Sequence, residues 1–150
     1  MDKKFRTFLE IAETLNKHHI VPIIYGSLGL YRIIEQLDEI NDIDITISDK
    51  NLIDKFTELK EIMDSIEYKQ DPNYMHEFTK GEGQIGFEPE SELADLGIDI
   101  DNLKIAEING VRFKELSVQD YLKIYSRNLA TWEKKVSSIK KKIEALKTKI

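Results

Sequence analysis

The sequence predicts an α/β (α+β) protein with a mixed central sheet flanked by helices and a C-terminal helical extension. Apolar side chains recur at three- and four-residue steps over residues 2–16, which is helical spacing. A short apolar run rich in β-branched residues, 20–25, ends at Gly26 as a buried strand would. Residues 42–47 alternate polar and apolar side chains, which is typical of a half-buried strand.

Length and composition limit the class of protein. The 150 residues, with 33% charged and 41% hydrophobic side chains, are typical of one globular domain, which we expect to span residues 1–150. The chain has no cysteine, which excludes a disulfide framework and a thiolate metal site. No apolar run approaches the roughly 20 residues that span a bilayer, and no apolar stretch of signal-peptide length follows the first residues. We therefore expect a cytoplasmic protein with no membrane partner.

The first half of the chain predicts alternating helices and strands in the order helix, strand, helix, strand, helix. These elements cover residues 2–16, 20–25, 28–37, 42–47 and 51–66. The second helix follows Gly26-Ser27 almost at once, so the local order is strand, Gly-Ser turn, helix. The last helix rests on an apolar stripe of Leu52, Phe56, Leu59, Ile62 and Met63.

The second half predicts short antiparallel strands followed by helices. The expected strands cover residues 67–70, 76–79, 84–87, 105–108 and 111–114. Pro89 ends the strand expected over 84–87, and residues 95–103 form a loop or a short helix. Asn109-Gly110 is the strongest turn signal, because both residues suit a type I′ hairpin turn. Ser117 and Asp120 resemble a capping box that begins another helix.

The last expected element is a long helix over about residues 129–150. Its apolar positions follow a heptad seam of Trp132, Val136, Ile139, Ile143, Leu146 and Ile150. Seven lysines and two acids lie between Thr131 and Ile150, although the net charge of the whole chain is −6. The seam predicts either an intrachain packing stripe or a homodimer contact. The net acidity argues against nucleic acid as a partner.

Gly26-Ser27 is the first candidate for a functional site. Glycine lets the backbone approach a ligand closely. The first N–H groups of the following helix and the Ser27 hydroxyl then face outward at the positive end of the helix dipole, which suits a phosphate. An ordinary helix N-cap is the alternative interpretation of Ser27.

Asp42 and Asp44 are the second candidate. They lie two residues apart on one strand, so their side chains point the same way. At an effective dielectric of about 20, two such carboxylates repel each other by roughly a few kcal/mol. A divalent, oxygen-preferring ion such as Mg²⁺ would neutralise them and bring substrate phosphates with it. The alternative is a pair of solvated side chains at the end of a strand.

These two motifs together resemble the nucleotidyltransferase superfamily, whose members include the lincosamide and aminoglycoside nucleotidyltransferases. The matching residues are Ile23 to Ser27 and Asp42 to Ile45. The resemblance extends more weakly through His76 to Phe78, through Gln84 to Pro89 and into the C-terminal segment. It implies a nucleotidyltransferase-type fold over most of the chain.

The resemblance also implies a reaction. A nucleoside monophosphate would pass from a nucleoside triphosphate, with ATP the favoured one, to the hydroxyl of a small molecule. Mg²⁺ would be held by Asp42 and Asp44, and these two residues with Glu88 would form the catalytic set. Gly26 and Ser27 would hold the phosphates at the turn between strand and helix.

Two basic residues are further candidates for nucleotide binding. Arg32 lies one turn into the helix after Ser27, from which it could reach a phosphate. Lys80 lies in the hairpin expected near the site. A solvated surface position is the alternative for both side chains.

The sequence departs from the family pattern at one position. The resemblance implies a third carboxylate where Gly86 stands, and Glu88, two residues later on the same face, is the expected substitute. Without a third carboxylate, the chain would be a catalytically impaired nucleotidyltransferase-fold module that binds a nucleotide or a partner. An Asp-x-Asp glycosyltransferase is a third alternative, although such domains usually need far more than 150 residues.

Overall fold

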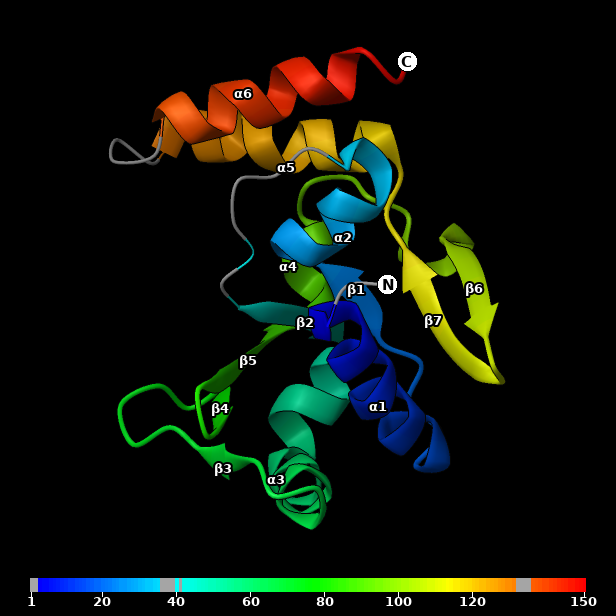
Figure 1. Ribbon diagram of the computed structural model, residues 1–150, viewed down its shortest axis with the longest axis vertical. Coiled ribbons are helices and arrows are strands. Elements are labelled where there is room, and N and C mark those ends of the chain that lie inside the picture. Colours follow the sequence, from blue (N-terminus) through cyan, green and yellow to red (C-terminus); the bar gives the residue numbers. More distant parts are fainter. Residues whose placement is uncertain (1–2, 36–39, 41, 132–135) are drawn as a thin grey trace.

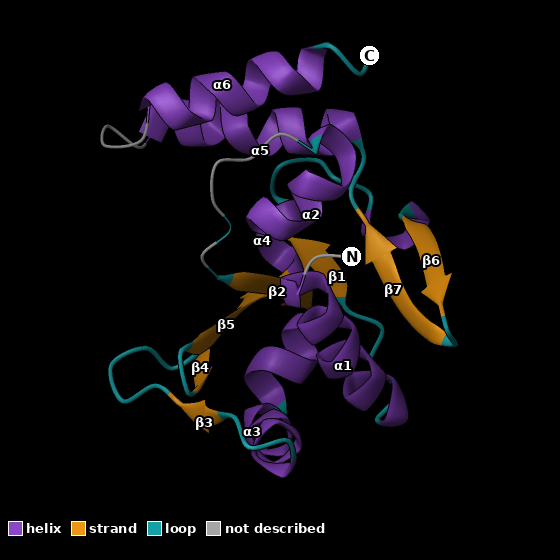
Figure 2. Ribbon diagram, viewed as in Figure 1, coloured by secondary structure: helices purple, strands orange, loops and turns teal. Residues whose placement is uncertain are grey.

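The computed structural model describes residues 3–35, 40, 42–131 and 136–150, and within these residues a seven-stranded mixed sheet is flanked by helices (Figures 1 and 2). The strand order is β3-β4-β5-β2-β1-β7-β6. The strands are β1 Ile23–Tyr25, β2 Ile43–Ile47, β3 Lys69–Gln70, β4 Glu77–Lys80, β5 Gly83–Pro89, β6 Lys104–Ile108 and β7 Val111–Glu115. This architecture confirms the fold class that the sequence predicts.

The sheet is mixed because its centre contains both kinds of strand pair. β2 is antiparallel to β1 and parallel to β5, while β1 is parallel to β7. The outer strands form antiparallel pairs, β3 with β4, β4 with β5, and β6 with β7. Both expected hairpins are therefore present, and the turn between β6 and β7 has positive φ at Asn109 and Gly110, as a type I′ turn requires.

The helices differ from the sequence expectation at several boundaries. They are α1 Lys3–Lys17, α2 Gly26–Ile34, α3 Phe56–Ser65, α4 Glu90–Ala94, α5 Val118–Thr131 and α6 Val136–Lys147. A π-helical segment, Lys50–Asp54, precedes α3, so the helix expected over 51–66 is divided. The unexpected α4 begins directly after Pro89, which is its N-cap residue. The capping box at the start of α5 is confirmed, because the Ser117 N–H donates to Asp120 Oδ2 at 2.9 Å and the Asp120 N–H donates to Ser117 Oγ at 3.1 Å.

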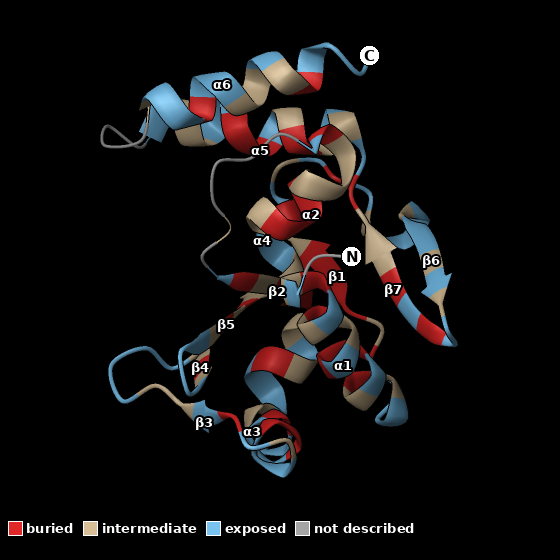
Figure 3. Cartoon of the chain, viewed as in Figure 1, coloured by how far each residue is buried: buried red, intermediate tan, exposed pale blue. Residues whose placement is uncertain are grey.

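The two faces of the sheet pack against largely different helices. One core cluster joins α1, α3 and Leu28 of α2 to the sheet and includes Phe8, Ile45 and Phe78. The other joins α2, α4, α5 and α6 and includes Ile23 and Tyr121. Figure 3 shows the buried positions along the strands and on the inner sides of the helices. Since side chains alternate along a strand, the isoleucines of β2 enter the first cluster and its polar residues face the second.

The C-terminal extension differs from the single helix expected over 129–150. Residues 129–131 are the end of α5, the described part of α6 begins at Val136, and Trp132 lies outside the described residues. α6 lies along α5 and also contacts α2 (Figure 1). Ile139 and Leu146 of the seam are buried in the second cluster, so the seam serves intrachain packing. Two shorter helices packed together bury more of this seam than one extended helix would.

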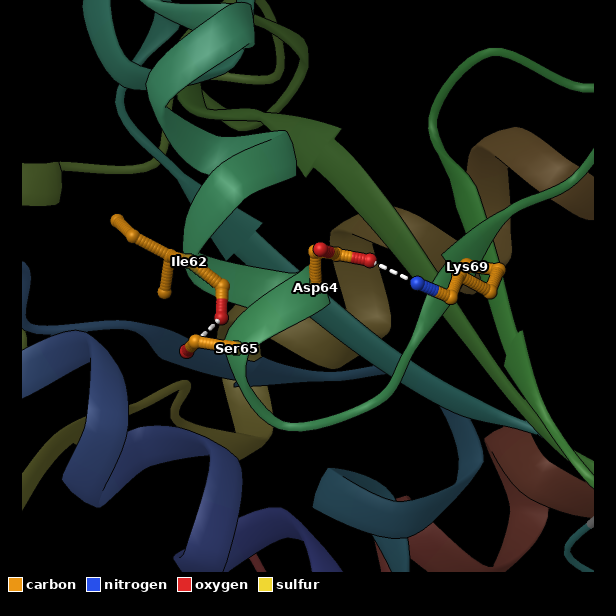
Figure 4. Close-up of polar contacts among 4 residues, drawn as sticks. All are labelled: Ile62, Asp64, Ser65 and Lys69. Carbon is orange, nitrogen blue, oxygen red and sulfur yellow. Dashed lines mark hydrogen bonds and ion pairs between the residues drawn. The ribbon is translucent and has the colours of Figure 1, made fainter.

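Polar contacts fasten the end of α3, one of them within the helix and one to the neighbouring strand β3 (Figure 4). The Ser65 hydroxyl donates to the Ile62 carbonyl at 2.5 Å, and Lys69 on β3 forms an ion pair with Asp64.

Among the described residues, no helix is long and apolar enough to cross a membrane.

Candidate functional site

Acidic side chains gather on the face of the sheet that turns away from α1 and α3. Asp44 on β2 stands opposite Tyr25 on β1 and opposite Gly86 on β5. Gly86 in turn stands opposite Glu77 on β4. Because directly paired residues point to the same side of a sheet, Tyr25, Asp44, Gly86 and Glu77 form one row across four strands. We call this row the carboxylate row.

A second row runs beside the first on the same face. Thr46 stands opposite Glu88 on one side and opposite Ile23 on the other. Glu88 is half-buried, whereas Thr46 is fully buried and its hydroxyl has no hydrogen-bond partner in the described part of the chain. Asp42, which precedes β2, is exposed. The strand register thus places Asp44 and Glu88 on one face, and the charge of Asp42 acts on Asp44 from the residue before β2.

Two glycines make room for the Asp44 carboxylate. Gly26 has a φ of 63°, and a Cβ atom there would overlap Asp44 Oδ2. A Cβ atom at Gly86 would lie 3.1 Å from Asp44 Oδ1, which is a tight contact. The glycine of the Gly-Ser motif is therefore required both by its backbone conformation and by the neighbouring acid. The close approach also places Asp44 directly beside the start of α2.

Burial and like charges raise the pKa values of two acids in this cluster. Burial raises the pKa of Asp44 to about 6, and the charges of Asp42 and Glu77 add to this effect. Burial also raises the pKa of Glu88 to about 7, helped by the charge of Glu92 and by a hydrogen bond with it. Such shifts indicate that the ionised forms of both acids are poorly solvated and lie among like charges. A cation or a positively charged ligand would remove this cost.

Two basic residues from the C-terminal helices approach the same region. The positive charge of Lys142 on α6 partly offsets the rise in the pKa of Asp44. Lys142 Nζ lies 5.2 Å from the ring centroid of Tyr125. The Arg127 charge on α5 lowers the pKa of Tyr25, which burial raises to about 12. Sequence reasoning missed both residues. The only signal was the general basicity of the C-terminal segment, which names no particular side chain.

Ser27 lies in the first turn of α2, directly after the carboxylate row. The N-cap residue of α2 is Tyr25, which makes no capping hydrogen bond with its side chain. Ser27 is therefore not the N-cap that the sequence offered as the alternative. The first N–H groups of a helix have no partner within that helix, and here, next to the half-buried Asp44 carboxylate, they suit an anion that arrives together with a cation.

The structure places Arg32 and Lys80 away from the carboxylate row. Arg32 lies in the last turn of α2, where its Nε donates to Glu115 Oε2 at 3.2 Å. Its guanidinium carbon lies 4.4 Å from the ring centroid of Phe5. Lys80 lies at the far end of β4, with its Nζ 3.7 Å from Glu67 Oε2. Both side chains are thus engaged elsewhere, because α2 and β4 carry them past the site.

The donor set at the row fits a hard divalent cation. Asp42 and Asp44 supply carboxylate oxygens, which Mg²⁺ prefers, and the half-buried Asp44 carboxylate is destabilised by partial burial and by nearby like charges. Within the described residues, no group of three or more acidic, histidine or cysteine side chains is already gathered tightly enough to hold a metal ion. Binding through two protein carboxylates plus substrate phosphates is the usual arrangement for Mg²⁺.

Comparisons with known proteins agree with this fold. No protein-family model matches the sequence. The crystal structure of ANT(2″)-Ia in complex with adenylyl-2″-tobramycin superimposes with a TM-score of 0.62, at 14% identity, over 99% of this chain and 90% of that one. The crystal structure of an antigenic nucleotidyltransferase-like protein from Paracoccidioides brasiliensis gives a TM-score of 0.58, at 15% identity, over 92% of this chain and 72% of that one. The resemblance to the nucleotidyltransferase superfamily is thereby confirmed at the level of the fold.

A relative from Bacillus subtilis (strain 168) is similar in sequence as well. The uncharacterized protein YnaI is 36% identical over 129 residues, which are 85% of this chain and 83% of YnaI. Identity at this level over most of both chains implies a shared fold. The chain therefore belongs to the same family as YnaI and has the nucleotidyltransferase fold.

Proposed function

We propose that this protein is a metal-dependent nucleotidyltransferase that transfers a nucleoside monophosphate from a nucleoside triphosphate to the hydroxyl of a small molecule. The observation that carries the proposal is the Asp44 carboxylate, which is half-buried between two glycines and adjoins the start of α2. Burial raises its pKa, and the negative charges of Asp42 and Glu77 add to the rise. A site with this excess of charge beside free helix N–H groups fits a metal-bound triphosphate.

Each residue has a distinct role in this proposal. Asp42 and Asp44 hold Mg²⁺, which when bound neutralises phosphate charge and polarises the phosphoryl group. Gly26 lets the triphosphate approach the α2 N-terminus, where the backbone N–H groups and the Ser27 hydroxyl donate to phosphate oxygens. Glu88, with a pKa of about 7, has the proton affinity of a general base that accepts the proton of the attacking hydroxyl.

Positive side chains on the C-terminal helices complete the nucleotide site in this proposal. The charges of Lys142 and Arg127 act on Asp44 and Tyr25, and in this proposal the same two charges balance those of the phosphates. These two residues replace Arg32 and Lys80 as the favoured phosphate-binding cations. The site thus draws on both ends of the chain.

The nucleotide and the acceptor follow from the relatives by analogy. ANT(2″)-Ia has been solved with adenylyl-2″-tobramycin. An adenylyl donor and a polyhydroxylated acceptor are therefore the first substrates to test, with ATP ahead of the other triphosphates. The nucleotidyltransferase fold leaves no support for the glycosyltransferase alternative.

A second candidate function is a nucleotide-binding or partner-binding module without turnover. The observation that favours it is Gly86, which offers no side chain directly opposite Asp44. A site with fewer carboxylates would bind a nucleotide but stabilise the reacting phosphorus less well.

The test is transfer of an α-phosphate-labelled nucleotide to a library of hydroxylated metabolites and aminoglycosides in the presence of Mg²⁺. We expect labelled product and pyrophosphate release from the wild type, and loss of both in Asp44→Asn. Asp54→Asn, an exposed aspartate on the segment before α3, is the matched control. Nucleotide binding without pyrophosphate release from any acceptor would contradict the enzyme proposal and favour the second candidate.

A further inference from the structure

The first turn of α2 meets side chains of two other elements at its two glycines. At Gly26 it meets the Asp44 carboxylate of β2. At Gly29, three residues further along, a Cβ atom would overlap the hydroxyl oxygen of Tyr121, a residue of α5. The Tyr121 hydroxyl therefore fills the space that a side chain at position 29 would take and touches the backbone of α2.

Tyr121 is held firmly in the second core cluster. Its side chain is only 1% exposed, and its ring stacks on the ring of Tyr125 with 6.1 Å between centroids and 15° between planes. It lies in the first turn of α5, where its N–H donates to the Ser117 carbonyl at 3.1 Å, directly after the capping box. A side chain held in this way cannot move aside freely, so it limits how closely α2 approaches α5.

The two helices begin at neighbouring parallel strands. β1 leads directly into α2, and β7 leads into α5 after two residues. β1 and β7 are parallel, and the Lys114 N–H donates to the Pro22 carbonyl at 2.8 Å beside their pairing. Because the sheet fixes where both helices begin, the contact between Tyr121 and Gly29 determines how the first turn of α2 lies beside the site.

The Tyr121 hydroxyl makes no hydrogen bond that would explain its presence. Among the described residues, it is one of the buried polar groups without a hydrogen-bond partner. Such a hydroxyl destabilises the folded state, and a phenylalanine would fill the same place without this cost. A phenylalanine would lack only the atom that touches Gly29, so this contact is what the hydroxyl supplies.

We propose that Tyr121 is a positioning residue for the triphosphate site, in which its hydroxyl acts as a spacer that sets the first turn of α2 against Asp44. This inference rests on the proposed function, in which the N–H groups of that turn and the Ser27 hydroxyl bind the phosphates. Tyr121 is buried and acts on the nucleotide only through α2.

The experiment compares stability and nucleotide binding in Tyr121→Phe. Urea denaturation measures stability, and isothermal titration calorimetry with Mg²⁺ measures binding of an ATP analogue that carries a methylene group between the α- and β-phosphates. We expect the urea midpoint to stay at or above the wild-type value, because an unpartnered buried hydroxyl is removed. We expect affinity for the analogue to fall by about tenfold, because the phosphate-binding groups are displaced.

The matched control is Tyr68→Phe. Tyr68 is 7% exposed and belongs to the first core cluster, on the α1–α3 side of the sheet. Its replacement should leave the affinity for the analogue unchanged. A merely structural role for Tyr121 would instead lower the urea midpoint and the affinity of Tyr121→Phe together.

A second pair of variants tests the spacer itself. Gly29→Ala alone should lower both the urea midpoint and the affinity, because its Cβ atom overlaps the Tyr121 hydroxyl. Gly29→Ala combined with Tyr121→Phe moves one heavy atom from the phenol to the helix and so conserves the volume between them. We expect the double variant to recover most of both losses, after the Ile24 carbonyl oxygen, 3.1 Å from the new Cβ atom, shifts slightly.

The outcomes separate this inference from the proposed function. If Tyr121→Phe binds the analogue as tightly as the wild type, the positioning role is refuted and the proposed function stands. If the double variant recovers the urea midpoint but not the affinity, the hydroxyl is not a spacer and the inference is refuted. If the wild type itself binds no analogue, the proposed function is refuted together with the inference.

Discussion

The two faces of the sheet are built on different principles, although the same strands form both. On the side of α1 and α3, β2 presents isoleucines to a cluster of aromatic rings, in which Phe8 packs edge-on against Phe113 at 5.3 Å between centroids. On the other side, β2 presents Asp44 and Thr46, and the neighbouring strands add Glu77 and Glu88. One face is fully buried and apolar, while part of the other buries charge.

Burial of apolar side chains on the α1–α3 face stabilises the fold, whereas burial of acids on the site face costs stability. Complete burial of an aromatic side chain contributes roughly 1.5–3 kcal/mol by area alone. Burial of an acid among like charges costs free energy unless a partner compensates it. The α1–α3 side therefore stabilises the sheet, and the site side can hold uncompensated acids for a ligand. The predictions below test this division, beginning with the largest effect.

Phe8→Ala should cause the largest loss of stability. Phe8 is completely buried and contacts both Phe5 and Phe113. A buried phenylalanine replaced by alanine costs about 3–5 kcal/mol of unfolding free energy. Urea denaturation followed by circular dichroism measures the change. A loss below about 1 kcal/mol would contradict the view that this face carries the stability.

Asp44→Asn should increase the unfolding free energy near neutral pH, whereas Phe8→Ala lowers it. The unfolded aspartate ionises near 3.8, whereas the folded one has a pKa of about 6, so the folded state retains a proton over this interval. The wild type therefore loses stability as pH rises from about 4 to about 6, and Glu88 extends the loss to about 7. We expect Asp44→Asn to reduce the fall in unfolding free energy between pH 4 and pH 7 by up to about 2 kcal/mol, measured by urea denaturation at a series of pH values.

The control for the pH measurement is Asp54→Asn, an exposed aspartate outside the site. Its unfolding free energy should follow the wild-type curve between pH 4 and pH 7, to within about 0.5 kcal/mol. If Asp44→Asn follows the same curve as well, Asp44 is not a buried, destabilising acid in the ligand-free protein.

Gly26→Ala should cost more than the same change at another glycine with a similar backbone. Gly26 and Gly81 have φ values of 63° and 59°, so both alanines pay the left-handed strain of about 1–2 kcal/mol. Only at Gly26 would the new Cβ atom overlap Asp44, since Gly81 has open space around it. The difference in unfolding free energy between the two variants measures how tightly Asp44 is held. Equal losses would show that Asp44 moves aside freely.

The local parts of this architecture could be predicted from the sequence because their signals lie within a few residues. The alternation of residues 42–47 identified the face that carries Asp44, and Asn109-Gly110 identified a hairpin. The Gly-Ser turn followed by α2 was equally local. In each case the backbone conformation is fixed by neighbours in the chain.

The residues near the site that the sequence did not identify depend on how distant strands and helices pair in the fold. Glu77 lies 33 positions along the chain from Asp44, and the two share a row only because both stand opposite Gly86, one from β4 and one from β2. Lys142 reaches the site because α6 packs along α5, whereas the heptad seam alone predicted one long helix. No local pattern encodes these meetings, because the same residues in another register would point elsewhere.

Arg32→Gln should have the smallest effect, and it tests a residue that the sequence assigned to the nucleotide. The Arg32–Glu115 ion pair is partly exposed, with side-chain exposures of 28% and 18%, so its loss with the ring contacts should cost only about 1 kcal/mol. Nucleotide affinity, measured by isothermal titration calorimetry, should not change. A weaker affinity would mean that Arg32 leaves Glu115 when a phosphate binds, so that α2 contributes to the site through both of its ends.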